Sequence, residues 1–175
     1  MMTKDASERI KRLKSEVLEL GRNPAEYLYD LNTLNAYRIE HTKLGDYAYI
    51  LINDKQHGKE VRVDLYDFYT KRLYSYRWTR SNSDPIKDYP HTNIPDGTGK
   101  KINLQLHVLV MGGVVPDKVI DHNDGDHYNA SRSNLNYVTI AQNNQNRHPN
   151  LFFTPRSKKA PKNIRAEYIS LLAWY

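Results

Sequence analysis

Residue types that can hydrolyse a phosphate ester gather in one segment of the chain, residues 118–147 (KVIDHNDGDHYNASRSNLNYVTIAQNNQNR). Asp121 and His122 are adjacent, Asn134 follows Asp121 by 13 positions, and Asn143 follows Asn134 by 9. An imidazole accepts a proton from water near neutral pH, and carboxylate and amide oxygens suit a hard divalent ion. Such an ion stabilises charge on a leaving oxygen. The segment therefore contains the groups that metal-dependent phosphodiester hydrolysis requires.

Each of these side chains has an expected role. Adjacent residues of a strand point in diverging directions, so Asp121 would act through the metal and His122 through the attacking water. Asn143 would add a second oxygen ligand, and Arg147, one helical turn later, would bind a phosphate oxygen. Asn134 would accept a hydrogen bond from one ring nitrogen of His122 and leave the other free. One carboxylate and one amide leave room for water and substrate oxygens, which favours Mg²⁺, with Mn²⁺ as a substitute.

The elements that must position these residues follow from the local pattern. Residues 119–122 and 134–138 are typical of short strands, and Gly125 allows a tight turn between them. Thr139 and Gln142 fit a capping box, which predicts that a helix begins there. The segment is therefore expected to form strand, loop, strand and helix, a ββα unit.

The same residues and spacings resemble the HNH (ββα-metal) endonucleases of phages and mobile introns. In that family an Asp-His pair, an Asn-Leu pair and a helical Asn occur in this order, which here are Asp121-His122, Asn134 with its neighbour, and Asn143. The resemblance implies His122 as general base and Asn134 as the orienting residue, with Asp121 and Asn143 as metal ligands. It covers roughly residues 46–147 and implies double-stranded DNA as the partner.

The region before this motif is expected to contain short strands. Residues 47–52, 61–65, 73–78 and 102–106 are rich in Tyr and β-branched residues, and residues 81–99 read as a long polar connection. His107 lies in a segment similar to the family's His-Arg-Leu, where it either holds the segment in place or contacts phosphate. His127 is expected to be exposed in the loop.

The N-terminal residues 1–40 are predicted to form a helical hairpin. Ile10, Leu13, Val17 and Leu20 recur on one face of a helix over 6–20, and Asn23 resembles the N-cap of a second helix. The hairpin would pack on the core, or serve in dimerisation or DNA contact. Residues 41–149 would form the endonuclease domain, so the fold class is α+β.

Positive charge is concentrated at the C-terminus. Residues 147–175 contain six basic side chains against one acidic, which accounts for five of the net charge of +6. A terminal basic block of this kind either contacts a polyanion or increases solubility. Residues 150–175 are therefore expected to form a basic DNA-contacting segment, only faintly similar to the Apetala-type module of related phage proteins. The basic residues assigned to DNA binding are Arg147, Arg156, Lys158, Lys159, Lys162 and Arg165.

Composition excludes several other classes. The chain of 175 residues has no cysteine, which rules out disulfides and a zinc–cysteine site. It has no long apolar run, so neither a membrane span nor a signal peptide is expected, and the predicted location is the cytoplasm, that of the host cell if a phage encodes the protein. One copy of the motif favours a monomer that nicks one strand, as a nicking or homing endonuclease. The alternatives are a homodimeric restriction-type HNH enzyme and a non-catalytic DNA-binding protein on the same scaffold.

Overall fold

The computed structural model describes residues 4–30, 32–52, 58–80 and 88–146. These residues form an α+β structure of small antiparallel sheets and short helices, as the sequence predicts. In chain order the helices and strands are α1 (Lys4–Glu19), η1 (Pro24–Glu26), β1 (Tyr37–Thr42), β2 (Gly45–Ile52), β3 (Lys59–Asp64), α2 (Leu65–Thr70), η2 (Leu73–Ser75), β4 (His91–Pro95), β5 (Lys101–Gln105), α3 (Leu106–Met111), β6 (Lys118–His122), η4 (Arg132–Asn134), β7 (Leu135–Thr139) and α4 (Ile140–Asn146).

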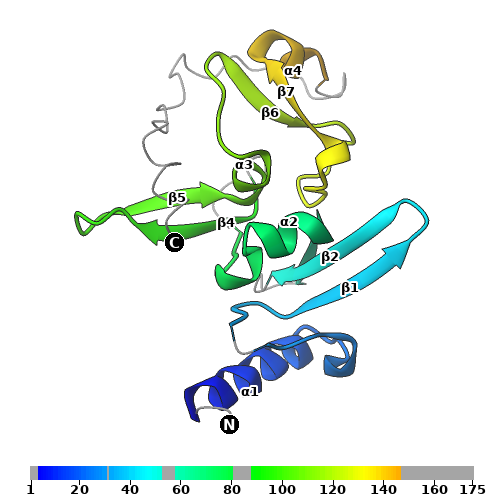
Figure 1. Ribbon diagram of the computed structural model, residues 1–175, viewed down its shortest axis with the longest axis vertical. Helices are drawn as coiled ribbons and strands as arrows, with labels where there is room; N and C mark the ends of the chain where they lie inside the picture. Colours follow the sequence, from blue (N-terminus) through cyan, green and yellow to red (C-terminus); the bar gives the residue numbers. More distant parts are fainter. Residues whose placement is uncertain (1–3, 31, 53–57, 81–87, 147–175) are drawn as a thin grey trace.

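Strands β1, β2 and β3 form a three-stranded sheet, whose β1 and β2 lie between α1 and α2 in Figure 1. Alternate residues of β3 are buried, with Val61 and Val63 inside and their neighbours partly exposed. Because side chains alternate across a strand, this pattern turns one face of the sheet toward the main core. Phe68 of α2 and Trp78 complete that core together with residues of α3. The core therefore joins the sheet to the elements that follow it.

Helix α1 confirms the first predicted helix and packs on the sheet through its apolar stripe. Leu13 and Val17 are almost fully buried, and Val17 lies in a second cluster with Tyr27 and Leu51. In Figure 1 α1 lies at one end of the molecule, and β6, β7 and α4 lie at the other. The described part of α1 is therefore a packing element, remote from the predicted site.

The second helix of the expected hairpin is absent from the described residues; only the single turn η1 forms. Asn23 does act as its cap, because its side chain accepts a hydrogen bond from the amide of Ala25 at 3.1 Å. The chain then becomes extended at Tyr27, and Leu28 donates a backbone hydrogen bond to the carbonyl of Tyr37 at 2.6 Å. Tertiary pairing with the start of β1 thus replaces the helical hydrogen bonds that the local pattern favoured.

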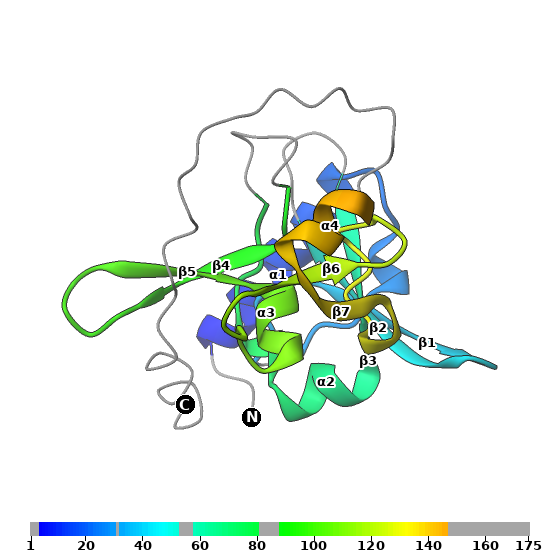
Figure 2. The same cartoon turned by 90° about the horizontal axis from the view of Figure 1, so that it is seen from above.

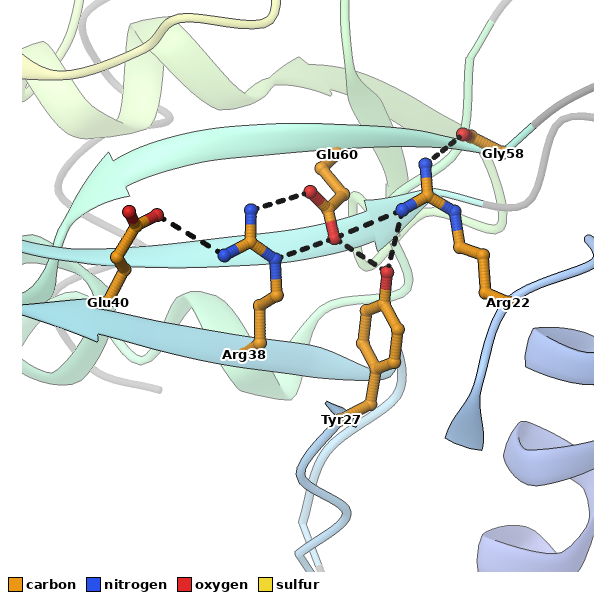
Figure 3. A network of polar contacts seen from close by, with 6 residues as sticks. All are labelled: Arg22, Tyr27, Arg38, Glu40, Gly58 and Glu60. Atoms are coloured by element: carbon orange, nitrogen blue, oxygen red, sulfur yellow. Dashed lines mark hydrogen bonds and ion pairs between the residues drawn. The ribbon is translucent and has the colours of Figure 1, made fainter. Parts of the chain in front are cut away.

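A partly buried polar network holds this extended segment in place (Figure 3). The Tyr27 hydroxyl donates to Oε1 of Glu60 at 2.6 Å and accepts from Arg22 at 2.9 Å, while Arg38 binds both oxygens of Glu60 at 3.0 and 2.9 Å. Burial raises the pKa of Tyr27 to about 12, with further contributions from the hydrogen bond and charge of Glu60. Burial also opposes ionisation of Glu60, but hydrogen bonds from Arg38 and Tyr27 outweigh it and keep the pKa of that carboxyl low.

Two further predictions are corrected between the sheet and the motif. Residues 73–78 form no strand, because Leu73 begins the short helix η2 and the indole of Trp78 donates to the Leu73 carbonyl at 2.7 Å. Within residues 81–99, expected to be a connection throughout, β4 pairs antiparallel with β5. The predicted strands over 47–52, 61–65 and 102–106 are present as β2, β3 and β5, with Leu106 beginning α3.

Candidate active site

The predicted strand, loop, strand and helix are all present as β6, the residues that follow it, β7 and α4. Strands β6 and β7 pair antiparallel with Asp121 opposite Asn136 and His122 opposite Leu135. The capping box closes as predicted: the Thr139 amide donates to Oε1 of Gln142 at 2.9 Å, and the Gln142 amide donates to the Thr139 hydroxyl at 3.2 Å. This cap fixes the start of α4, the helix that carries Asn143.

Strand alternation separates the two residues of the Asp-His pair. His122 is buried, with 5% of its surface exposed, whereas Asp121 is partly exposed. Asn143 is also partly exposed on α4, which packs across β6 and β7 (Figure 1). The structure therefore brings Asp121, His122 and Asn143 to one small unit, with both oxygen donors accessible to solvent.

Asn134 organises the loop between the strands. Its buried amide group donates to Oδ1 of Asp124 and to the carbonyl of Asn129, both at 2.8 Å, and its Oδ1 accepts from the Asp124 amide at 3.1 Å. The predicted hydrogen bond from His122 to Asn134 is not among these contacts. Asn134 thus shapes the turn at Gly125, where φ is +74°, rather than the imidazole ring itself.

The same network keeps Asp124 ionised. Burial opposes its charge, but hydrogen bonds from the side chain of Asn129, the backbone of Asp126 and the side chain of Asn134 hold its pKa below the usual value. The Asn129 amide donates to Oδ2 of Asp124 at 2.6 Å. A charged residue at this position therefore binds the loop together.

Two arginines attach the loop to strand β3 and helix α2. Arg132 donates to both oxygens of the fully buried Asp67 at 2.6 and 2.8 Å. Arg62 of β3 donates to Oδ1 of Asn129 at 3.1 Å and to the Ser131 hydroxyl at 3.2 Å, and its backbone pairs with the same segment. The position of His122 is thus fixed relative to the core of the protein.

His122 lies in a cluster of aromatic rings drawn from separate parts of the chain. Its ring centroid is 5.2 Å from that of His107 on α3, 5.4 Å from that of His127 and 5.9 Å from that of Tyr89. His127 stacks on Tyr89 at 4.0 Å and is partly buried, so the prediction of an exposed His127 is wrong. No local pattern indicated Tyr89, which lies two residues before β4.

The histidines of this cluster are neutral at physiological pH. Burial lowers the pKa of His122 to about 4, with His127 adding to the effect, and burial lowers the pKa of His107 to about 3. Within the described residues, His122 Nε2 and His107 Nδ1 are buried atoms that have no hydrogen-bond partner. His107 is buried against the rings of Tyr89 and His122, and its unpaired nitrogen shows that packing does not use all of its hydrogen-bonding capacity.

An unprotonated imidazole with an unpaired nitrogen can accept a proton from water or a hydrogen bond from a ligand. An anionic phosphate next to His122 would raise its pKa toward neutrality, because an opposite charge favours the protonated form. Burial in the free protein therefore lowers the pKa of His122, and a charged substrate in the complex would raise it. That combination suits a general base that must be unprotonated before the reaction and hold a proton after it.

The donor set of the unit fits a hard divalent ion. It consists of the carboxylate of Asp121 and the amide oxygen of Asn143, both accessible to solvent. The described part of the chain contains no cluster of three or more His, Cys, Asp or Glu side chains arranged to hold a metal. A site made of these two donors would thus rely on water and phosphate oxygens for its remaining ligands.

The residues assigned to DNA binding from the charge pattern lie outside the described residues; they are Arg147, Arg156, Lys158, Lys159, Lys162 and Arg165.

Comparison of the chain with protein families, with characterised proteins and with solved structures finds no match. Among the described helices, none has the length and apolar character needed to cross a membrane.

Proposed function

We propose that this protein is a metal-dependent DNA endonuclease of the HNH type. The observation that carries the proposal is the position of His122 on β6, buried beside Asp121 and with Nε2 unpaired among the described residues. The capped helix α4, which brings Asn143 to the same strand pair, gives further support. The order and spacing of these residues resemble the HNH family.

In this proposal His122 accepts the proton of the attacking water at Nε2; because this atom is buried in the free protein, the rings around it would have to move apart for water to reach it. Asp121 and Asn143 would hold a magnesium ion through their oxygen atoms; when bound, the ion supplies stabilisation of negative charge on the leaving oxygen. Asn134 is a positioning residue, because it acts on the loop through Asp124 and not on the substrate. The Arg62 and Arg132 contacts keep that loop against the body of the protein.

The test is cleavage of supercoiled plasmid by the full chain with and without magnesium. His122→Ala is expected to lower the single-turnover rate by about 10²–10⁴ while DNA binding is retained. His41→Ala is the matched control, because His41 is an exposed histidine on β1 that binds Asp46 at 2.8 Å. Equal rates in His122→Ala and wild type would refute the assignment. DNA binding without cleavage at any magnesium concentration would favour the non-catalytic alternative.

A further inference from the structure

Strands β4 and β5 form a hairpin that projects from the rest of the molecule in both views (Figures 1 and 2). Among the described residues no third strand joins this two-stranded sheet; only Thr79 bridges its base, at His91. The hairpin is therefore a narrow ribbon attached to the body at one end.

The two faces of the ribbon differ in character. Residues directly opposite one another lie on the same face, so Thr92 with Leu104 and Ile94 with Ile102 form one face, which is buried or partly buried. The other face carries two exposed asparagines opposite each other. We call it the polar face, and its members are His91, Asn93, Pro95, Lys101, Asn103 and Gln105.

The turn at the tip is held by its own hydrogen bonds. Oδ1 of Asp96 accepts from the amide of Thr98 at 2.8 Å and from the amide of Lys100 at 3.0 Å, and the Asp96 amide donates to the Lys100 carbonyl at 3.0 Å. Gly97 and Gly99 supply the positive φ angles of the turn, +79° and +88°. A ribbon already fixed in shape loses little conformational entropy when it binds.

We propose that the polar face enters the major groove of DNA and reads bases beside the cleavage site, adenine above all. This inference rests on the proposed function and extends it to sequence recognition. The major groove of B-form DNA admits a two-stranded β-ribbon, whereas the minor groove is only about 6 Å wide. The deep, narrow major groove of an RNA helix excludes side chains, so the shape of the hairpin fits DNA.

The chemistry of the polar face matches adenine. An Asn or Gln amide offers one donor and one acceptor that pair with N7 and N6 of adenine. Asn93 and Asn103 approach each other only at 3.5 Å, which leaves most of the hydrogen-bonding capacity of both amides for a base. Lys101 is exposed on the same face and can neutralise a phosphate at the edge of the groove.

The hairpin begins at the candidate active site. Tyr89, two residues before β4, packs against His122, and β5 continues directly into α3, which carries His107. Five residues of an antiparallel strand span about 14 Å, or about four base pairs. DNA held with a phosphate at His122 would therefore place the read bases within about one helical turn of the cut, on one side of it.

The test is selection of DNA bound by the full chain from a library of random duplexes, followed by sequencing. Asn93→Ala/Asn103→Ala is expected to reduce adenine enrichment at two or more positions by about 10- to 100-fold. Asn103→Asp should shift the preference at one of these positions toward cytosine, whose N4 donates to a carboxylate. Lys101→Ala should weaken binding to all sequences alike. Lys43→Ala, at the exposed turn between β1 and β2, is the matched control.

Cleavage of the same library by wild type separates the two proposals. If wild type enriches a sequence and the Asn93/Asn103 variant does not, the hairpin recognises the bases, whether or not wild type cuts the DNA. If wild type does not cut the DNA, the proposed nuclease activity is refuted. Identical enrichment in the variant and in wild type overturns the reader and leaves the nuclease standing. Absence of DNA binding by wild type overturns both.

Discussion

Acid is expected to destabilise this protein through His107. The side chain is buried on α3, and burial lowers its pKa from 6.5 to about 3, with the nearby His122 and His127 adding to the shift. In the unfolded chain the same imidazole takes up a proton near pH 6.5. Between these two values the unfolded state binds a proton that the folded state does not, so the contribution of His107 is present above pH 6.5 and is lost as the pH falls toward 3.

The size of the effect follows from proton linkage. Each pH unit within that interval costs at most about 1.4 kcal/mol for one histidine, so His107 should remove about 2 kcal/mol between pH 6.0 and 4.5. The pKa values of the Glu60 and Asp124 carboxyls are held below their usual values, so their contributions to stability are lost mainly below the unfolded pKa values of about 4.3 and 3.9. His122 and His127, whose pKa values burial also lowers, contribute in the same direction.

The measurement is urea unfolding at a series of pH values, followed by tryptophan fluorescence, to which the buried Trp78 contributes. His107→Phe keeps a ring at the position and removes the titration, so its free energy of unfolding should fall by about 2 kcal/mol less than that of wild type between pH 6.0 and 4.5. His41→Phe controls for the loss of an exposed histidine. Parallel curves for wild type and His107→Phe would refute the reasoning.

Three further predictions concern the loop, the metal and the C-terminus. Arg132→Met leaves the buried carboxylate of Asp67 unpaired and should lower the free energy of unfolding, measured in urea, by about 2 kcal/mol. The loss is smaller than for a fully buried pair because Arg132 is half exposed, and an unchanged urea midpoint would contradict the prediction. Asn143→Asp keeps an oxygen ligand and should retain far more magnesium-dependent cleavage than Asn143→Ala, whereas equal inactivity at saturating magnesium would exclude simple ligation. Removal of residues 150–175 should lower the log–log salt slope of DNA binding by about 0.9 per lost phosphate contact, and an unchanged slope would make the segment a solubility device.

Sequence patterns predicted the elements whose stabilising contacts are local. The apolar stripe of α1 and the capping box of Thr139 and Gln142 each act within a few residues, and both are present. The prediction of a second N-terminal helix was wrong because Tyr27 makes hydrogen bonds with residues of other elements, among them Glu60, 33 positions away. No pattern near position 27 contains that information, so a correct cap at Asn23 still led to the wrong element.

The candidate site likewise contains residues that the sequence could predict and residues that only the fold brings together. Asp121, His122, Asn134 and Asn143 could be selected from one segment because their order and spacing are local. The rings around His122 come from α3, from the loop after β6 and from the residue two positions before β4. The pairing of β4 with β5 and the packing of α3 create that cluster, and neither was expected from the sequence.

The cluster around His122 contains two buried ring nitrogens that packing does not explain. Among the described residues His122 Nε2 and His107 Nδ1 are buried without a hydrogen bond, and a buried polar atom in that state costs about 1–3 kcal/mol. An apolar ring of similar size would avoid this cost at either position, since both side chains already lie among other rings. Hydrogen bonding therefore does not account for the two neighbouring rings of His122 and His107. The proposed role of His122 as a general base would account for the first of them, because a general base needs a nitrogen that the free protein leaves unused.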